Sequence, residues 1–334
     1  NKNRIFNNRN MRTQIYLRRG KEESLLRRHP WIFSGAIERV KSQGEVKEGE
    51  VVDVFTKSGE FIARGHYQIG SIAVRVLTFE EQEQIDQAWW NNRIAIAYDV
   101  RRTLALTDDE QTNCYRLVHG EGDSLPGLVI DIYDKVAVVQ CHSVGMYLSR
   151  MAIAEALRNT YGDKLTAIYD KSSQTVPFKA GLNAVDGYIW GKSDHKAHVV
   201  KENGEKFLVN WEEGQKTGFF LDQKYNRAAV ARLAKGKHVL DCFTHTGSFA
   251  LNAAQAGASY VTAVDISADA LAMAKANAER NGVDERMDFY CADVFDYLTE
   301  LANNKKAFDY DFVILDPPAF TKSRDTLKNA IKGY

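Results

Sequence analysis

The fold of the C-terminal part of this chain is decided by residues 238–257, HVLDCFTHTGSFALNAAQAG, and by YVTAVD at 260–265. A branched apolar run that ends in an acid, then a loop, then apolar residues at helical spacing is typical of a strand, a turn and a helix. The alternation continues outward, with a helix over 225–234 before it and the segments ADALAMAKANAERNG, MDFYC, VFDYLTELA and DFVILD after it. Gly257 and Gly282 fall where helices should end. The pattern predicts a parallel, doubly wound, Rossmann-like α/β sheet.

An acid stands at the end of each predicted strand: Asp241, Asp265, Asp293 and Asp316. Ligands of open α/β sheets bind beyond the carboxyl ends of the strands, so we expect these acids to line one site. A carboxylate after the second strand can accept hydrogen bonds from both hydroxyls of a ribose. For Asp241 taken by itself, a turn-capping role fits at least as well as a ligand contact, but four acids at four strand ends are not all expected to be caps.

The loop DCFTHTG at 241–247 favours one cofactor over another. A nicotinamide dehydrogenase would need close-approach glycines for the pyrophosphate, and only Gly247 is present. S-adenosylmethionine has no phosphate, and Asp241 could meet its amino group. The sequence therefore predicts S-adenosylmethionine as cofactor. No metal site is expected, because the four cysteines lack zinc-ligand spacing.

The last predicted strand runs into ILDPPAF at 314–320. Two prolines fix a rigid turn and leave carbonyl groups free to accept from the amine of a flipped-out base. Phe320 could stack on that base, a contact worth about 1 to 3 kcal/mol. Asp316, Pro317, Pro318 and Phe320 are therefore the candidate catalytic turn.

The rest of the chain predicts two further domains. Short β runs with glycine turns fill most of residues 11–80, one long helix is expected over 80–108, and β hairpins about Asp134-Lys135 and Asn203-Gly204 follow. We expect a small β domain at 11–80, a central α+β domain at 81–195 and the α/β sheet at 196–334. Residues 1–10 are expected to be a disordered extension, or to lie upstream of the natural start.

Charge and composition limit the function classes. The 334 residues carry no net charge, but residues 1–30 hold nine Lys or Arg against two acids. Such a cluster fits a phosphate-contacting surface and fits a solvated tail equally well. No apolar run is long enough for a membrane span and no secretory signal is present, so we expect a cytoplasmic protein with reduced, buried cysteines.

Several segments resemble one family. They are RHPWIFSGAI at 28–37, RLVHGEGDSLPGLVIDIY at 116–133, GQKTGFFLDQ at 214–223, DCFTHTGSFALNA at 241–253, VDIS at 264–267, ADVFDYL at 292–298 and LDPPAF at 315–320. These are similar to the bacterial ribosomal RNA large subunit methyltransferase I family, and the resemblance covers Met11 to about Ser323. It implies an N-terminal PUA RNA-binding domain, a central domain and a class I methyltransferase domain.

The resemblance also implies an activity, methylation of cytosine C5 in large-subunit ribosomal RNA with S-adenosylmethionine as donor. The site residues that it implies for the methionine part are Asp241, Phe243, Thr244 and Gly247. It implies Asp265 for the ribose and Asp293 with Val294 for the adenine, and we add Ile266, Ser267 and Asp316 as further candidate cofactor-binding residues. A segment that closes over the cofactor would contain Gln215, Lys216 and Gly218–Gln223, with Phe220, Asp222 and Gln223 as its candidate contacts. Trp31 is expected to be a core residue rather than an RNA contact.

Cytosine-5 methylation needs a thiolate that adds to C6. The resembling family supplies it from a Thr-Cys-Ser segment after a fifth strand, and none of Cys114, Cys141, Cys242 and Cys291 stands in such a place. A doubly wound sheet normally has strands beyond the fourth, so we expect the chain to be a fragment. Two alternatives stay open, a guanine-N methyltransferase and a non-catalytic RNA-binding protein that keeps the fold. The oligomeric state also stays open, a homodimer included.

Overall fold

The computed structural model describes residues 12–177, 181–194, 197–304, 309–321 and 327–333. They form two compact units. The first contains the described residues up to Asp109, those from Asn113 to 194, and Trp211–Gly218; the second contains Glu110–Thr112, the described residues from Ala197 to Asn210, and those from Phe219 onward. The expected extension at 1–10 lies outside the described residues. The three-domain boundaries at 80 and 195 stay a prediction.

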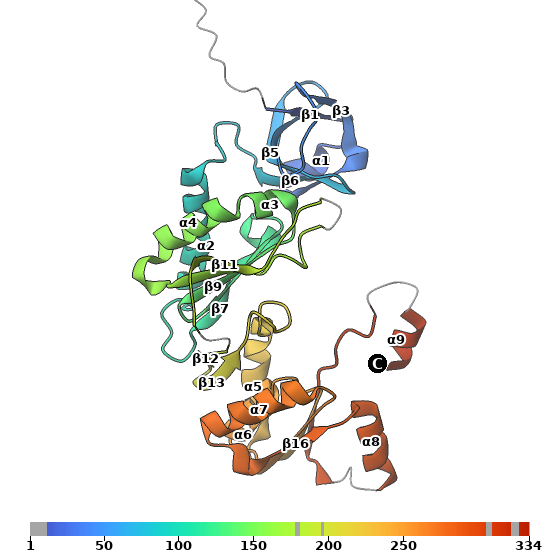
Figure 1. Ribbon diagram of the computed structural model, residues 1–334. Coiled ribbons are helices and arrows are strands. Elements are labelled where there is room, and N and C mark those ends of the chain that lie inside the picture. Colours follow the sequence, from blue (N-terminus) through green and yellow to red (C-terminus); the bar gives the residue numbers. More distant parts are fainter. Residues whose placement is uncertain (1–11, 178–180, 195–196, 305–308, 322–326, 334) are drawn as a thin grey trace, which may run out of the picture. The chain divides into compact units, whose positions relative to one another are not determined.

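The first unit begins with a six-stranded sheet in the order β2-β6-β5-β4-β1-β3, drawn in blue in Figure 1. Its elements are β1 (Gln14–Leu17), α1 (Glu23–Leu26), β2 (Trp31–Phe33), β3 (Ile37–Lys41), β4 (Val51–Phe55), β5 (Phe61–Tyr67) and β6 (Ile72–Thr78). Alternating apolar side chains such as Ile15, Val52 and Val54 form the core, as the β pattern predicts. The short helix α1 was not predicted.

Trp31 is not the core residue that the sequence predicts. It is only partly buried, and its indole Nε1 donates to Glu121 Oε1 at 2.8 Å. Its ring lies beside those of His29 and Phe33, with centroids 5.8 and 6.4 Å away, and Phe33 is 49% exposed. The prediction was wrong because an indole N–H needs a polar partner, which it finds here at the surface of the sheet.

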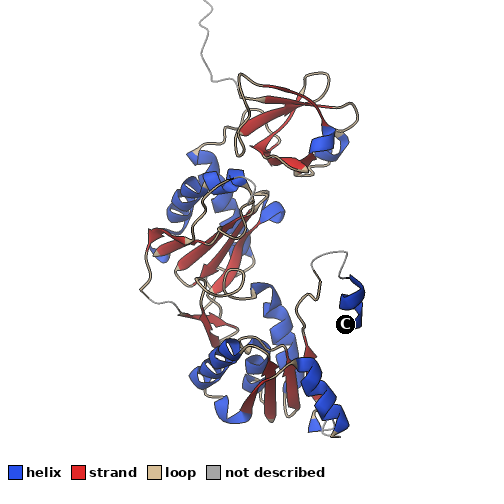
Figure 2. Cartoon of the chain, turned by 45° about the vertical axis from the view of Figure 1, so that its right-hand side comes forward, coloured by secondary structure: helices blue, strands red, loops and turns tan. Residues whose placement is uncertain are grey.

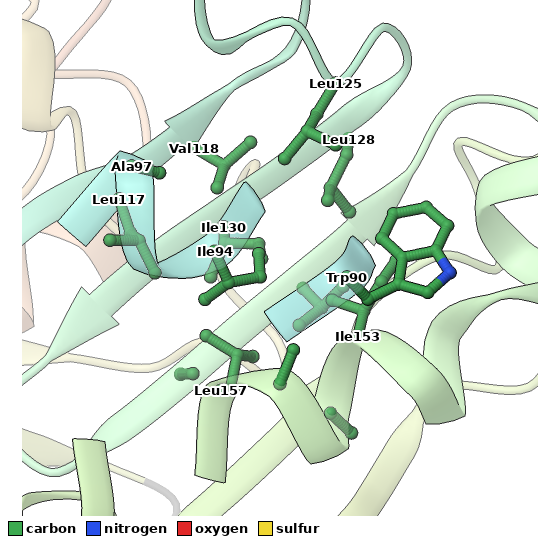
Figure 3. Packing of buried hydrophobic residues seen from close by; sticks show 14 of the residues in the cluster. Trp90, Ile94, Ala97, Leu117, Val118, Leu125, Leu128, Ile130, Ile153 and Leu157 are labelled. Atoms are coloured by element: carbon green, nitrogen blue, oxygen red, sulfur yellow. The ribbon is translucent and has the colours of Figure 1, made fainter. Parts of the chain in front are cut away.

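A five-stranded sheet follows in the first unit, in the order β11-β10-β9-β8-β7. Its elements are α2 (Gln87–Thr103), β7 (Cys114–His119), β8 (Leu128–Tyr133), β9 (Val136–Cys141), α3 (Val144–Leu148), α4 (Arg150–Tyr161), β10 (Ala167–Asp170) and β11 (Gly187–Gly191). Figure 3 shows Trp90 and Ile94 of α2 and Ile153 of α4 packed with Leu117 and Ile130 of the sheet. The predicted hairpin about Asp134 is confirmed, since β8 and β9 pair antiparallel there.

Helix α2 is shorter than the predicted helix over 80–108. It begins after Asp86, whose side chain accepts from Trp89 N. In the segment before α2, Arg64 donates to the main-chain carbonyls of Glu81 and Glu83. Helical periodicity in the sequence gives no sign of this tertiary contact, so it could not be used to predict where the helix begins. At the other end, Ala105 has a φ of 55° and cannot continue a right-handed helix.

The second unit holds the hairpin β12 (His198–Glu202) and β13 (Glu205–Val209) and a parallel sheet in the order β16-β15-β14-β17. Figure 2 shows this sheet with its helices. The helices and strands are, in chain order, α5 (Lys224–Ala234), β14 (His238–Cys242), α6 (Ser248–Gln255), β15 (Tyr260–Asp265), α7 (Ala268–Asn281), β16 (Met287–Cys291), α8 (Val294–Asn303), β17 (Phe312–Leu315) and α9 (Leu327–Gly333). The predicted α/β alternation and the hairpin about Asn203-Gly204 are confirmed. Strand β17 is an edge of this sheet, with Val313 51% and Leu315 60% exposed.

Two buried carboxylates face each other across the hairpin, Glu202 and Glu205. Glu202 is paired with Arg227, whereas Oε2 of Glu205 has no hydrogen-bond partner among the described residues. Burial, followed by the charge of Glu202, raises the pKa of Glu205 from 4.5 to about 8. The folded protein therefore holds this proton more tightly than the unfolded chain does.

We expect Glu205→Gln to flatten the pH dependence of stability. The stabilisation linked to the Glu205 proton is complete below pH 4.5 and is lost as the pH rises to about 8, by up to about 1.4 kcal/mol per pH unit. The glutamine carries no such proton, so its urea midpoint should exceed that of the wild type increasingly from pH 5 to pH 8. Equal midpoints at pH 8 would contradict this expectation.

Candidate cofactor site

The strand order brings two of the predicted site acids together. Strands β14 and β17 are parallel neighbours in register, with Cys242 opposite Leu315, so Asp241 lies close to the start of the turn at Asp316. Strand β15 lies on the other side of β14 and ends at Asp265. The strands that follow β14 in the sequence therefore lie first on one side of it and then on the other, so the strand order switches at β14. Open α/β sheets bind ligands at such a switch point.

Asp241 is 1% exposed and organises the loop that follows β14. Its Oδ2 accepts from Thr244 Oγ1 at 2.5 Å and from Ala250 N at 3.0 Å, while no hydrogen bond from the described residues reaches Oδ1. Burial raises the pKa of Asp241 to about 7. The two hydrogen bonds to Oδ2 act to lower this pKa, whereas the charges of Asp316 and Asp265 act to raise it. One oxygen of a carboxyl that titrates near neutrality is thus left for a ligand.

The loop takes an unusual backbone path. Phe243, His245 and Gly247 have φ values of 60°, 51° and 78°, so left-handed residues alternate along it. The amides of Thr244 and Gly247 bond the carbonyls of Val264 and Thr244, and the amide of His245 bonds Asp265 Oδ2. These three amides are hydrogen-bonded within the protein, so the loop presents its carboxylates rather than these amides to a ligand.

The other two acids predicted to bind the cofactor also accept main-chain hydrogen bonds. Asp265 takes His245 N on Oδ2 and Ser267 N on Oδ1, each at under 3 Å. Asp293 caps helix α8 by accepting from Phe295 N and Asp296 N on Oδ1, and no hydrogen bond from the described residues reaches its Oδ2. Turn and cap roles are therefore present in Asp241, Asp265 and Asp293. Each carboxylate still has acceptor capacity, because an oxygen can accept two hydrogen bonds.

The segment before α5 reaches this edge of the sheet. The Phe220 ring lies edge-on to His245 with centroids 5.6 Å apart, and Gln223 Nε2 is 3.5 Å from Asp316 Oδ2. Burial lowers the pKa of His245, so this ring is neutral at pH 7. Asp222 is exposed. Gln215 and Lys216 belong to the first unit, and their role in a cofactor site stays a prediction.

The proline turn is bordered by aromatic rings. Phe320 lies near Phe243 and Phe295, with centroid distances of 6.3 and 5.7 Å, and Phe243 and Phe295 are 6.1 Å apart. Phe295, 46% exposed, was missed by sequence reasoning, which had no signal to separate it from Tyr297, the other aromatic residue of α8. Pro318 is exposed and Pro317 partly buried. Phe320 therefore belongs to an aromatic cluster beside the turn.

Three predicted residues have surroundings that the sequence did not indicate. The side chain of Val294 is 3% exposed and packs with Leu240 and Val264, so any contact with adenine would come from its backbone. Ser267 caps helix α7 by accepting from Ala270 N, while Ile266 is 70% exposed. Cys291 is exposed, contrary to the expectation of four buried thiols. The other three cysteines are buried.

The donor and acceptor chemistry of this edge fits S-adenosylmethionine. The cofactor presents an ammonium, two ribose hydroxyls and an adenine amine, all hydrogen-bond donors, and the edge presents acceptors on Asp241, Asp265 and Asp293. Across the described residues we find no group of three His, Cys, Asp or Glu arranged to hold a metal ion. Nor does any helix of the described chain have the length and apolar character to cross a membrane.

Comparison with known proteins agrees with this geometry. Residues 15–79 match the PUA-like domain family, and residues 116–332 match the S-adenosylmethionine-dependent methyltransferase family. Ribosomal RNA large subunit methyltransferase I of Aeromonas hydrophila is 42% identical over 97% of this chain and 80% of its own length, and that of Klebsiella pneumoniae is 40% identical over 96% and 79%.

Solved structures extend the comparison to the fold. A chain described as an S-adenosylmethionine-dependent methyltransferase from Streptococcus mutans matches with a TM-score of 0.77 and 25% identity, covering 95% of this chain and 80% of that one. A methyltransferase solved in complex with SAH matches with a TM-score of 0.78 and 24% identity, covering 93% and 78%. The chain belongs to the ribosomal RNA large subunit methyltransferase I family of S-adenosylmethionine-dependent methyltransferases.

Proposed function

We propose that this enzyme methylates cytosine C5 in large-subunit ribosomal RNA. The observation that carries the proposal is the edge at β14 and β17, where a buried carboxyl with one unused oxygen, Asp241, lies beside the Asp316 turn. The names of the relatives specify large-subunit ribosomal RNA as their substrate, and the PUA-like match at residues 15–79 is consistent with RNA binding.

Each acid would hold a different part of the cofactor. Oδ1 of Asp241 would accept from the methionine ammonium, Asp265 from the ribose hydroxyls, and Asp293 from the adenine amine. When bound, S-adenosylmethionine supplies an electrophilic methyl group. The neutral ring of His245 and the ring of Phe220 would border the methionine part without adding a positive charge that would repel the sulfonium.

The target base would meet the Asp316-Pro317-Pro318 turn. Neither proline has an N–H to donate. The turn therefore presents hydrogen-bond acceptors to the base, namely main-chain carbonyl groups and the Asp316 carboxylate. The cluster of Phe243, Phe295 and Phe320 supplies ring surface on which a flipped-out base can stack. An exocyclic amine on cytosine or guanine fits these acceptors, so the turn by itself does not select the methylated atom.

The thiolate needed for attack at C6 does not come from the buried cysteines of residues 1–334. Burial raises the pKa of Cys141 and of Cys242 to about 12, and Cys114 is 1% exposed. Cys291, the last residue of β16, is exposed, and its Sγ lies 3.5 Å from the carbonyl oxygen of Ile266. The family resemblance implies a nucleophile in a Thr-Cys-Ser segment, and none of these four cysteines stands in such a segment.

The decisive experiment uses large-subunit ribosomal RNA labelled with tritium at cytosine C5. Methylation at C5 replaces the C5 hydrogen, so tritium should be released to water in proportion to the methyl groups transferred. Methyl transfer without tritium release would overturn the C5 assignment and favour the guanine-N alternative. Cofactor binding without any methyl transfer to RNA would favour the non-catalytic alternative.

A pH dependence of cofactor binding tests the role of Asp241. Its pKa of about 7 must fall when a cationic ammonium is bound, so the affinity should be constant above pH 7 and decrease below it, approaching about tenfold per pH unit. Calorimetric titration with S-adenosylmethionine from pH 5.5 to 8.5 measures this slope. Asp241→Asn should bind more weakly throughout and lose the slope; a slope that persists in that variant would assign the titration to another group.

A further inference from the structure

The hairpin β12–β13 is joined to the candidate cofactor site by two buried side chains. Arg227 of α5 is 1% exposed, and its Nε and Nη2 donate to the two carboxylate oxygens of Glu202 on β12 at 2.6 and 2.8 Å. Asn277 of α7 is fully buried and bonds the backbone of β13. A two-stranded hairpin is marginal alone, so these contacts define its place in the second unit.

The first link leads from the hairpin to the segment before α5. Nη2 of Arg227 also donates to the carbonyl of Phe220 at 2.8 Å. Its guanidinium lies 4.7 Å from the ring centroid of Phe219 and 5.9 Å from that of Phe249, within the distance of a cation–π contact for each ring. Because one nitrogen serves both Glu202 and Phe220, the ion pair fixes where that carbonyl sits.

The side chains of Phe220 and Gln223 connect this segment to the candidate cofactor site. The Phe220 ring contacts His245 of the cofactor loop, and Gln223 is 3.5 Å from Asp316. Asn226 Nδ2 donates to Gln223 Oε1 at 2.7 Å, which orients the Gln223 amide. A displacement of the Phe220 carbonyl would therefore move both side chains away from the groups proposed to meet the cofactor and the base.

The second link leads from the hairpin to the cofactor loop itself. Asn277 Oδ1 accepts from Leu208 N at 2.8 Å, and its Nδ2 donates to the carbonyl of Thr246 at 3.2 Å. Thr246 precedes Gly247, where the loop packs against the same helix at Ala274. One amide side chain thus joins the hairpin backbone to the loop backbone without access to solvent.

We propose that the hairpin β12–β13 is a positioning element for the cofactor site, acting through Glu202 and Arg227 on the segment Phe220–Gln223 and through Asn277 on the loop at Thr246. The proposal rests on the proposed cofactor site. Glu202, Arg227 and Asn277 are positioning residues in it, because they touch the segments that contact the cofactor and not the cofactor itself.

Asn277→Ala and Asn281→Ala form a matched pair for the second link. Asn281 lies one turn further along α7 and also bonds the hairpin, accepting from Lys206 N at 2.9 Å and donating to Lys206 O at 2.7 Å. Among the described residues it makes no hydrogen bond to the loop. We expect Asn277→Ala to weaken S-adenosylmethionine binding about tenfold or more, and Asn281→Ala to leave it within about twofold of the wild type.

Two conservative variants protect the test against misfolding. Arg227→Lys keeps the charge but cannot bridge Glu202 and Phe220 with a planar fork. Asn277→Asp keeps the acceptor for Leu208 N and loses the donor to Thr246. Both should melt cooperatively and show weakened cofactor binding, with faster amide hydrogen exchange in 220–223 for Arg227→Lys and in 243–247 for Asn277→Asp.

The outcomes separate this proposal from the proposed site. If the wild type binds S-adenosylmethionine and Asp265→Asn does not, the site stands. Folded Arg227→Lys and Asn277→Asp proteins that then bind as the wild type does would overturn the positioning role alone. If Asp265→Asn binds as tightly as the wild type, the cofactor site itself is misassigned.

Discussion

Gly247→Ala is expected to lower the free energy of unfolding by about 3 kcal/mol and to weaken S-adenosylmethionine binding about a hundredfold. Gly247 has a φ of 78°, a region that a residue with a Cβ occupies at a penalty of about 1 to 2 kcal/mol. A Cβ at this position would also lie 2.8 Å from the Cβ of Ala274 on α7, which is closer than two non-bonded carbon atoms approach each other in proteins. The loop would have to move away from α7, and the acids that it positions would move with it.

Gly282→Ala is the matched control, because it carries the backbone penalty without the contact. Gly282 ends the same helix with a φ of 67°, and an added Cβ would meet nothing within 4 Å. We expect urea denaturation to show a loss of about 1 kcal/mol and calorimetry to show unchanged cofactor binding. Adding Ala274→Gly to Gly247→Ala should recover part of the affinity, since it removes the opposing Cβ. Normal binding by Gly247→Ala would be incompatible with this account.

The sequence predicted the parallel sheet and the positions of its acids because both depend on local order. The apolar runs of β14 to β17 and the helices between them are read directly from periodicity, and parallel strands must place their terminal acids at one edge. The same reasoning could not tell whether Asp241 or Asp293 accepts from main-chain amides, because that depends on the conformation of the loop rather than on spacing.

The contacts that position the site could not be predicted from one sequence. Glu202 and Arg227 are 25 residues apart, and charged residues are usually exposed, so nothing marked them as a buried pair. Asn277 is a polar residue within a helix, a weak signal that becomes meaningful only when Leu208 and Thr246 are found on either side of it. Tertiary hydrogen bonds likewise made α2 begin later than predicted and kept Trp31 at the surface.

Arg227→Leu is expected to lower the free energy of unfolding by about 3 to 5 kcal/mol, because it leaves the fully buried carboxylate of Glu202 without its partner. The carbonyl of Phe220 also loses its donor, and the rings of Phe219 and Phe249 lose their cation–π contact. Glu202→Leu should be destabilised similarly, since it leaves a buried guanidinium with one of its two partners. Urea denaturation at pH 7 measures both losses.

The double variant Arg227→Leu with Glu202→Leu distinguishes the removal of a charge from the removal of packing. Replacing a buried ion pair by apolar residues of similar volume is often close to neutral, so the double variant should be more stable than either single variant by about 2 kcal/mol or more. It should nevertheless bind S-adenosylmethionine poorly, because nothing holds the Phe220 carbonyl. Additive losses in the double variant would show that the two side chains stabilise the hairpin independently. Restored stability together with restored binding would mean that the ion pair contributes to folding and has no separate effect on the cofactor site.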